Sequence, residues 1–246
     1  MSIVKTLKAL AAGALGALAV LNAAQAANFT VEPIRVELSP RQPSFALTIR
    51  NQSEDDAVVV QLQTMAWSQD QGQEILAPSH EVLATPPIFT LAPGAAQVVR
   101  VAYRRPMPQS EEQSYRLLVR EVPAAPDPNK PGVQLELEMS LPVFIKPAAP
   151  VQPDLRWQAS LQPDGGISLA VRNEGNAHVQ LANLAFSLPD GGDVLAGYAG
   201  FGYVLPRQTR EFPLKPLPGK AIPPGASLRL KAYADTTTVD LPLAID

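Results

Sequence analysis

Short runs of alternating apolar and polar residues make up most of this chain, and turn-forming residues separate them. The run Gln97-Val98-Val99-Arg100-Val101-Ala102-Tyr103, for example, closely follows the turn signal Ala92-Pro93-Gly94. Such signals recur about every 8–12 residues, and no apolar stripe repeats with the period of a helix. The pattern predicts an all-β protein built from antiparallel sandwiches or barrels. The expected strands are 29–38 (with a kink at Pro33), 44–50, 57–67, 88–91, 97–103, 115–122, 133–146, 155–161, 166–173, 179–188, 212–214 and 227–234.

A Pro-rich stretch divides these strands into two sets. Residues 146–153 read Lys-Pro-Ala-Ala-Pro-Val-Gln-Pro, a composition that makes a short, stiff linker. We therefore expect two β-sandwich domains, residues 27–147 and residues 148–246, both near the usual size of a domain.

The first residues have the features of a secretory signal. Lys5 and Lys8 precede an apolar run from Ala9 to Leu21, and Ala24-Gln25-Ala26 is a small-x-small cleavage site. The apolar run is short for a membrane span, which needs about 20 residues. The pattern therefore favours a cleaved signal at residues 1–26 over a membrane anchor, and it predicts an exported protein.

The composition argues against several classes of function. The 246 residues include 26 Pro, no Cys and only two His, His80 and His178. Without Cys there are no disulfides or thiolate sites, and two distant His do not make a His-rich metal site, so we expect no metal or cofactor. The formal net charge of −3 gives no electrostatic case for nucleic-acid binding. Neither His has a catalytic partner at a motif spacing, and no Gly-rich phosphate loop occurs, so no catalytic residue or small-molecule substrate is predicted.

One segment alternates more cleanly than the rest. Residues 133–141 read Val-Gln-Leu-Glu-Leu-Glu-Met-Ser-Leu, which places every apolar side chain on one face of a strand. One interpretation is a half-buried core strand. The other is an edge strand that lends its apolar side chains to another protein by strand addition. The preceding residues 123–132 are Pro-rich and polar, which is typical of a loop rather than a tight hairpin. Periodicity alone leaves both interpretations open.

Several stretches, taken in their order and spacing, resemble one known family. They are 31–35 (Val-Glu-Pro-Ile-Arg), 84–89, 91–94, 97–101, 115–123, 141–147 and 171–179 (Val-Arg-Asn-Glu-Gly-Asn-Ala-His-Val). Together with the signal, they resemble the periplasmic PapD-like chaperones that assemble pili with an outer-membrane usher. The stretches 115–118 and 173–179 are most similar to the archaic branch, whose pili include spore-coat-U-like subunits. The resemblance implies two immunoglobulin-like sandwiches set at an angle with a binding cleft between them, and pilus subunits and the usher as partners.

The resemblance also implies which residues would bind a subunit. Val133, Leu135, Leu137 and Met139 would be donor residues, inserted into the open groove of a subunit that lacks its last strand. Each large aliphatic side chain buried in this way contributes about 1.5–3 kcal/mol before ordering costs.

Basic residues of the cleft would hold the terminal carboxylate of the subunit. Arg35 matches the first-strand arginine of the family, but Pro142 occupies the position of the usual lysine. Arg116 is our substitute for that lysine, and Arg100 is a weaker candidate. A guanidinium suits this role because it can hold a carboxylate with two parallel hydrogen bonds.

A third set implied by the resemblance concerns the orientation of the domains. Glu121, Lys146 and Asp235 fall where the family keeps an interdomain salt bridge, with Lys146 in place of the usual arginine. The alternative is that they are three ordinary surface charges.

Two other functions compete with that of a non-enzymatic chaperone. A pilus subunit or adhesin would also contain immunoglobulin-like domains, but it would usually carry an N-terminal donor extension, and only Ala27-Asn28 precede the first expected strand. An exported enzyme on a β-sandwich would need a catalytic carboxylate pair, and no motif selects one.

Overall fold

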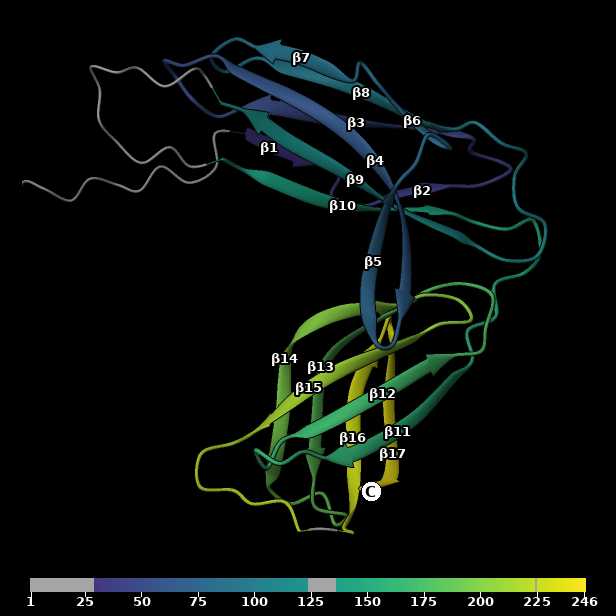
Figure 1. The fold of residues 1–246 in the computed structure, drawn as a ribbon, viewed down its shortest axis with the longest axis vertical. Coiled ribbons are helices and arrows are strands. Elements are labelled where there is room, and N and C mark those ends of the chain that lie inside the picture. Colours follow the sequence, from purple (N-terminus) through teal and green to yellow (C-terminus); the bar gives the residue numbers. More distant parts are fainter. Residues whose placement is uncertain (1–28, 124–135, 224) are drawn as a thin grey trace, which may run out of the picture.

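A computed structural model of the chain describes residues 29–123, 136–223 and 225–246, and within these ranges every regular element is a strand. This confirms the all-β prediction. The predicted signal at 1–26 and the predicted donor residues Val133 and Leu135 lie outside the described residues. Figure 1 shows two bodies set at an angle, and the chain passes between them after β10 (Glu138–Ile145) and before β11 (Leu155–Leu161). We call them the N-terminal and the C-terminal domain.

The N-terminal domain packs two sheets face to face. One sheet has the strand order β1-β3-β8-β6, and the other has the order β2-β10-β9-β4-β5, with β7 paired to β4. Alternating side chains such as Leu47, Ile49, Val99 and Leu117 are buried between the sheets, as period-2 patterning requires. The strands are β1 (Phe29–Glu32), β2 (Val36–Leu38), β3 (Ser44–Asn51), β4 (Val58–Asp70), β5 (Gln73–Pro78), β6 (Val82–Thr85), β7 (Ile88–Leu91), β8 (Ala96–Tyr103), β9 (Gln113–Val122) and β10.

The C-terminal domain is one curled sheet with the order β11-β12-β15-β14-β13-β16-β17. Its first strand meets the end of the chain, because Ala159 bridges Ile245 and the amide of Leu161 donates to the carbonyl of Asp246 at 2.9 Å. The apolar side chains inside the curl include Leu169, Leu181, Phe186 and Leu230. The further strands are β12 (Ile167–Asn173), β13 (Val179–Ser187), β14 (Val194–Val204), β15 (Thr209–Pro216), β16 (Ser227–Ala234) and β17 (Thr237–Ala244).

Several strands differ from the sequence prediction. The expected first strand 29–38 is divided around Pro33, and its halves β1 and β2 join different sheets. Strands β5, β6, β14 and β17 were not predicted. Strand β14 contains Gly197, Gly200 and Gly202, which lower strand propensity, and β5 is exposed throughout and therefore shows no buried alternation.

A long hairpin connects the two bodies. Strands β4 and β5 extend beyond the N-terminal domain, and Figure 1 shows their tip reaching the C-terminal domain. At the tip Gly72 bridges Arg210 of β15. Gly72 has a φ of 78°, and a Cβ there would lie 2.6 Å from Cγ of Glu211, so the turn requires glycine. The hairpin therefore fixes part of the interface between the domains.

Candidate functional site

An aromatic cluster fills the interface between the domains. Phe144 stacks on His178 with ring centroids 3.5 Å apart, and Trp67 and Tyr203 pack against Phe144 at 5.9 and 5.3 Å. Trp67, Phe144 and Tyr203 are buried, together with Leu205. Trp67 therefore packs in the interface, and Trp157 packs against the core of the C-terminal domain. The cluster shows that the interface is apolar at its centre.

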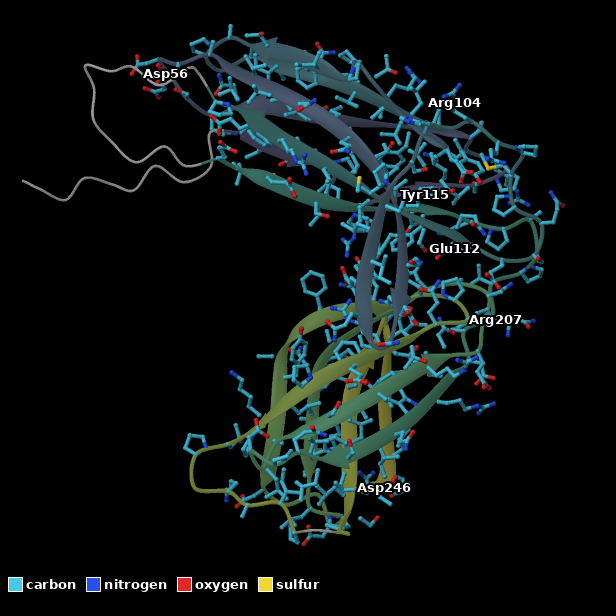
Figure 2. All side chains as sticks on the ribbon, viewed as in Figure 1. Asp56, Arg104, Glu112, Tyr115, Arg207 and Asp246 are labelled. Carbon is cyan, nitrogen blue, oxygen red and sulfur yellow. The ribbon has the colours of Figure 1, made fainter. Side chains whose placement is uncertain are left out.

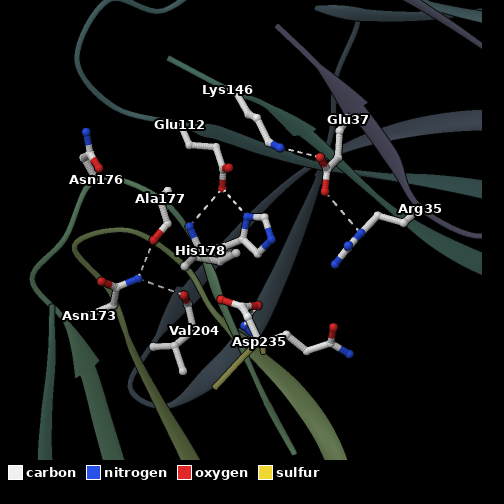
Figure 3. A network of polar contacts seen from close by, with 12 residues as sticks. Arg35, Glu37, Glu112, Lys146, Asn173, Asn176, Ala177, His178, Val204 and Asp235 are labelled. Atoms are coloured by element: carbon white, nitrogen blue, oxygen red, sulfur yellow. Dashed lines mark hydrogen bonds and ion pairs between the residues drawn. The ribbon is translucent and has the colours of Figure 1, made fainter. Parts of the chain in front are cut away.

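Polar contacts surround this cluster. The carboxylate oxygen Oε1 of Glu112 accepts a hydrogen bond from the backbone amide of His178 at 3.0 Å. The same oxygen lies 2.7 Å from the ring Nδ1 of His178 (Figure 3). Both side chains are nearly inaccessible, with 1% and 9% exposed. Gln69 of β4 donates to the carbonyl of Tyr203 at 2.7 Å and accepts from the amide of Leu205 at 3.0 Å. No catalytic role was predicted for His178, and no local pattern in the sequence indicates these contacts.

Two asparagines shape the stretch 173–178, and one of them, Asn176, links the domains. Asn176 donates to the carbonyls of Ser110 and Pro150, both at 3.0 Å, and so reaches the N-terminal domain and the linker. Asn173 is buried and donates to the carbonyls of Ala177 and Val204, as Figure 3 shows. Between them, a Cβ at Gly175 would lie 2.2 Å from the carbonyl oxygen of Gln152, so only glycine fits. The Asn-Glu-Gly-Asn motif therefore has a structural explanation.

A cleft of about 620 Å³ opens beside the aromatic cluster, between the two domains. Both predicted anchor residues, Arg35 and Arg116, line it, and so does Pro142. The structure thus brings together the residues that the sequence analysis proposed as a pair. The other lining residues are Ile34, Met139, Ser140, Leu141, Gln180, Phe201 and Tyr203.

Arg116 is held firmly at the back of the cleft. It lies opposite Pro142 in the ladder between β9 and β10, and its guanidinium carbon is 3.7 Å from the ring centroid of Trp67. Its Nη2 is 3.3 Å from Glu74 of β5, and Glu74 also pairs with Arg210 of the C-terminal domain. Burial lowers the pKa of Arg116, and the charge of Glu74 opposes that shift. An arginine stays protonated under these conditions, so the cleft contains a fixed cation.

Arg35 is the more accessible of the two cations. Its side chain is 42% exposed, and its Nε is 3.3 Å from Oε1 of Glu37. Glu37 also pairs with Lys146, as Figure 3 shows. Burial acts to raise the pKa of Glu37, but the hydrogen bond and charge of Lys146, together with the charge of Arg35, outweigh it and hold that pKa below its ordinary value. Glu37 is therefore an anion that competes with any other carboxylate for Arg35.

Within the part of the chain that the structure describes, strand β10 has an open edge next to the cleft. It pairs with β9 along its whole length but with β2 only at Val143, Phe144 and Ile145. The amide of Glu121 donates to the carbonyl of Leu137, so the alternation of an antiparallel ladder turns the backbone groups of Glu138, Ser140 and Pro142 outward. Proline is tolerated at position 142 because the N–H that it lacks would point away from β9 and would not bond to that strand.

The side chains of β10 face two different surroundings. Leu137 and Met139 are half-buried against the core of the N-terminal domain, and Met139 also borders the cleft, which Ser140 and Pro142 line. Leu137 and Met139 thus lie on the face that the alternation predicted. Because both are only partly covered, they keep apolar surface that another protein could bury.

The predicted interdomain salt bridge does not form. Glu121 is opposite Leu137, at the far end of the β9–β10 ladder from Lys146, which corresponds to a separation of roughly 25–30 Å. Lys146 pairs with Glu37 instead, and a carboxylate oxygen of Asp235 accepts from the amide of Gln180 at 3.1 Å. The contact between Glu112 and His178 joins the domains in place of this set.

Arg100, the weaker anchor candidate, is also away from the cleft. It lies exposed on β8, in the other sheet of the N-terminal domain, where it pairs with Ala46 and Thr85. His80 lies at a separate surface of the same domain, where its carbonyl accepts from Arg104 at 3.4 Å (Figure 2 labels Arg104). Among the described residues, no group of acidic or His side chains could hold a metal ion, and no helix is long and apolar enough to cross a membrane.

Comparisons with known proteins agree with this arrangement. Residues 28–150 match the family described as "Pili and flagellar-assembly chaperone, PapD N-terminal domain". The chain is 27% identical to the chaperone protein PmfD of Proteus mirabilis over 223 residues, which cover 87% of this chain and 84% of that protein. It is 30% identical to the chaperone protein PapD of Escherichia coli over 147 residues, 58% of each chain.

The fold is also shared with solved structures. The CsuC–CsuE chaperone–tip adhesion subunit complex, from archaic chaperone-usher Csu pili of Acinetobacter baumannii, contains a chain that matches with a TM-score of 0.64 and 22% identity. The match covers 89% of this chain and 98% of that chain. At 22% identity this match shows a shared fold and nothing more. The shared fold confirms the predicted arrangement of two domains at an angle.

Proposed function

Because this chain belongs to the family of pilus and flagellar-assembly chaperones, we propose that it binds pilus subunits in the periplasm and delivers them to an outer-membrane usher. The observation that carries the proposal is the open edge of β10, which leads directly into a cleft with two arginines. The edge offers backbone groups that have no partner among the described residues, and the cleft offers positive charge. Together they fit an extended segment of another protein that ends in a carboxylate.

The donor part of the site would supply apolar side chains. Leu137 and Met139 are half-buried on one face of β10 and its N-terminal extension, and the sequence pattern adds Val133 and Leu135 to the same face. Four such side chains would contribute on the order of 10 kcal/mol gross, of which ordering costs leave only a fraction as affinity. A subunit bound in this way could not pair prematurely with another subunit, and no nucleotide is needed for this protection.

The anchor part of the site would hold the terminal carboxylate of the subunit. Arg116 is pre-positioned by Trp67 and Glu74, so little side-chain entropy is lost when it binds. Arg35 is at the open side of the same cleft and would exchange its contact with Glu37 for the incoming carboxylate. The fixed guanidinium of Arg116 would thus replace the usual lysine beside the more adaptable Arg35.

Periplasmic co-expression tests the proposal. The chaperone would carry a C-terminal affinity tag and would be produced together with the exported small proteins encoded beside it, then purified and weighed by intact mass. We expect a stable one-to-one complex with a pilus subunit, and a chaperone mass that corresponds to cleavage after Ala26. Recovery of the chaperone without any exported partner would refute the proposed function.

A pair of variants on one strand sharpens this test. We expect Leu135→Asp to abolish recovery of the subunit, because a charge would enter an apolar groove. Gln134→Asp introduces the same charge at one of the polar positions of the alternating pattern, so it should leave the complex intact. Equal recovery with both variants would contradict the donor assignment.

A further inference from the structure

Two large aromatic side chains are exposed on the C-terminal domain. Phe201 of β14 is 60% exposed and Tyr233 of β16 is 53% exposed. Both pair with Ala182 of β13, Phe201 from one side and Tyr233 from the other. The three residues therefore form one row across the sheet, with the small alanine in the middle. We call this row the aromatic platform.

The platform is on the face of the sheet that borders the cleft. Tyr203 of β14 pairs with Gln180 of β13. Tyr203 is two residues from Phe201 on the same strand, and Gln180 is two residues from Ala182. Residues two apart on a strand share a face, and Tyr203, Gln180 and Phe201 all line the cleft. The platform thus continues the buried aromatic cluster outward, and the ring of Phe201 meets that of Tyr203 edge to face at 6.2 Å.

The backbone at this point is shaped irregularly. The register between β13 and β14 shifts between Ala182 and Leu184, and the intervening Asn183 has a φ of 52°. Such bulges re-aim neighbouring side chains and often occur beside binding sites. The platform is therefore part of a locally distorted sheet next to the cleft, rather than two aromatic residues scattered over a regular surface.

We propose that the aromatic platform binds the side chain of the subunit's last residue and selects subunits that end in a large apolar or aromatic residue. This inference rests on the proposed function, because Arg35 and Arg116 would fix the terminal carboxylate in the same cleft that Phe201 lines. A carboxylate held there brings the adjoining side chain close to Phe201. The exposed ring of Phe201 then gains an apolar partner, and Ile34, which is 65% exposed and lines the same cleft, offers further apolar surface.

Short synthetic peptides separate the two parts of this site. One peptide ends in phenylalanine with a free carboxylate, the second is identical but ends in glycine, and the third ends in phenylalanine amide. Titration of the full-length mature chaperone with each labelled peptide is followed by fluorescence anisotropy. We expect the free phenylalanine peptide to bind about tenfold more tightly than the glycine peptide, since an aromatic contact of this kind is worth about one factor of ten.

Variants then assign the preference to the platform. Phe201→Ala should remove most of the tenfold difference, and Phe201→Leu should keep part of it. Tyr233→Ala should reduce it less, because Tyr233 is not among the residues that line the cleft. Leu217→Ala is the matched control, as Leu217 is an exposed apolar residue elsewhere on the same domain and should change nothing. Circular dichroism confirms that each variant is folded.

The outcomes distinguish this inference from the proposed function. If both free-carboxylate peptides bind equally and the amide does not bind, the platform is excluded while the anchor remains. A preference for phenylalanine that survives Phe201→Ala also overturns the inference, and so does a lack of binding by all three peptides. Capture of a subunit in the co-expression experiment is independent of each of these results, because the donor strand contributes to it separately.

Discussion

The buried contact between Glu112 and His178 should control how firmly the two domains are joined. We expect Glu112→Ala to lower the free energy of unfolding by about 3 kcal/mol. Oε1 of Glu112 interacts with both the amide and the ring nitrogen of His178, and hydrogen bonds to a charged group contribute about 1.5–3 kcal/mol each. We take the low end of the summed contribution of the two interactions, because water can enter the space left by the truncated side chain and bond to His178.

Trp67 provides a direct signal for this effect. It is 4% exposed and packs against Phe144, which in turn stacks on His178. Since Trp157 is the only other tryptophan, a Trp157→Phe background leaves a fluorophore that reports the interface alone. Urea unfolding followed by Trp67 fluorescence should show a midpoint lowered by about 1 M for Glu112→Ala, given a slope of about 3 kcal/mol per molar for a chain of this size.

The neighbouring residue supplies the control. Glu111 also reaches the C-terminal domain, where it pairs with Arg207 at 3.4 Å, but the two side chains are 40% and 59% exposed. An exposed pair contributes about 0–1 kcal/mol, so Glu111→Ala should shift the midpoint little. Equal shifts for the two variants, or a Glu112→Ala shift within error of zero, would refute the reasoning from burial. Glu112→Gln keeps an acceptor oxygen and should give an intermediate value.

Three further predictions concern the charges at the cleft. Arg116→Ala should weaken binding of the free phenylalanine peptide by about tenfold or more, and Arg35→Ala should weaken it by less, because Arg35 is more exposed. If both variants bind the peptide as tightly as the wild type in a titration, neither arginine is an anchor. Glu37→Gln should tighten binding of the same peptide about threefold, because it frees Arg35 from its competitor, and unchanged affinity would show that Glu37 does not compete. The folded pKa of Glu37 lies below its ordinary value of 4.5, so its ionised form stabilises the protein above that pH and the benefit is lost as pH falls through the folded pKa. The difference in urea midpoint between wild type and Glu37→Gln should therefore shrink below about pH 4.5, and a difference that stays constant to pH 3 would contradict the assignment.

Local patterns predicted most strands because a half-buried strand leaves a period of two in the sequence. The strands that the patterns missed have physical reasons. Strand β14 uses Gly200 and Gly202, where a Cβ would lie 2.8 Å from the ring of Tyr198 and 2.8 Å from the guanidinium of Arg210. Neither glycine adds a side chain to the period-two pattern by which a strand is recognised. Strand β5 is exposed because it belongs to a hairpin that spans two domains, and a hydrophobic pattern records only burial.

Contacts between distant residues could not be predicted in the same way. Glu112 and His178 are 66 positions apart and belong to different domains, so nothing in the local sequence of either residue indicates the other. The set Glu121, Lys146 and Asp235 was transferred by resemblance, and the register of β9 against β10 separates its first two members. Matching positions in a family therefore placed Arg35 at the cleft but did not locate the interdomain contact.

Pro142 connects the two parts of the proposed site. Its ring removes an N–H from the open edge of β10, where a lysine would have offered both a backbone donor and a cation. Arg116 would supply the cation from across the ladder, because it lies opposite Pro142 and lines the same cleft. The lost donor is not replaced on β10, so a bound strand would make one backbone hydrogen bond fewer at this position. Binding of a subunit would therefore depend more on the guanidinium groups and the apolar donor side chains than on the backbone hydrogen bonds of the β10 edge. The carboxylate peptides test the guanidinium groups, and the Leu135→Asp variant tests the donor side chains.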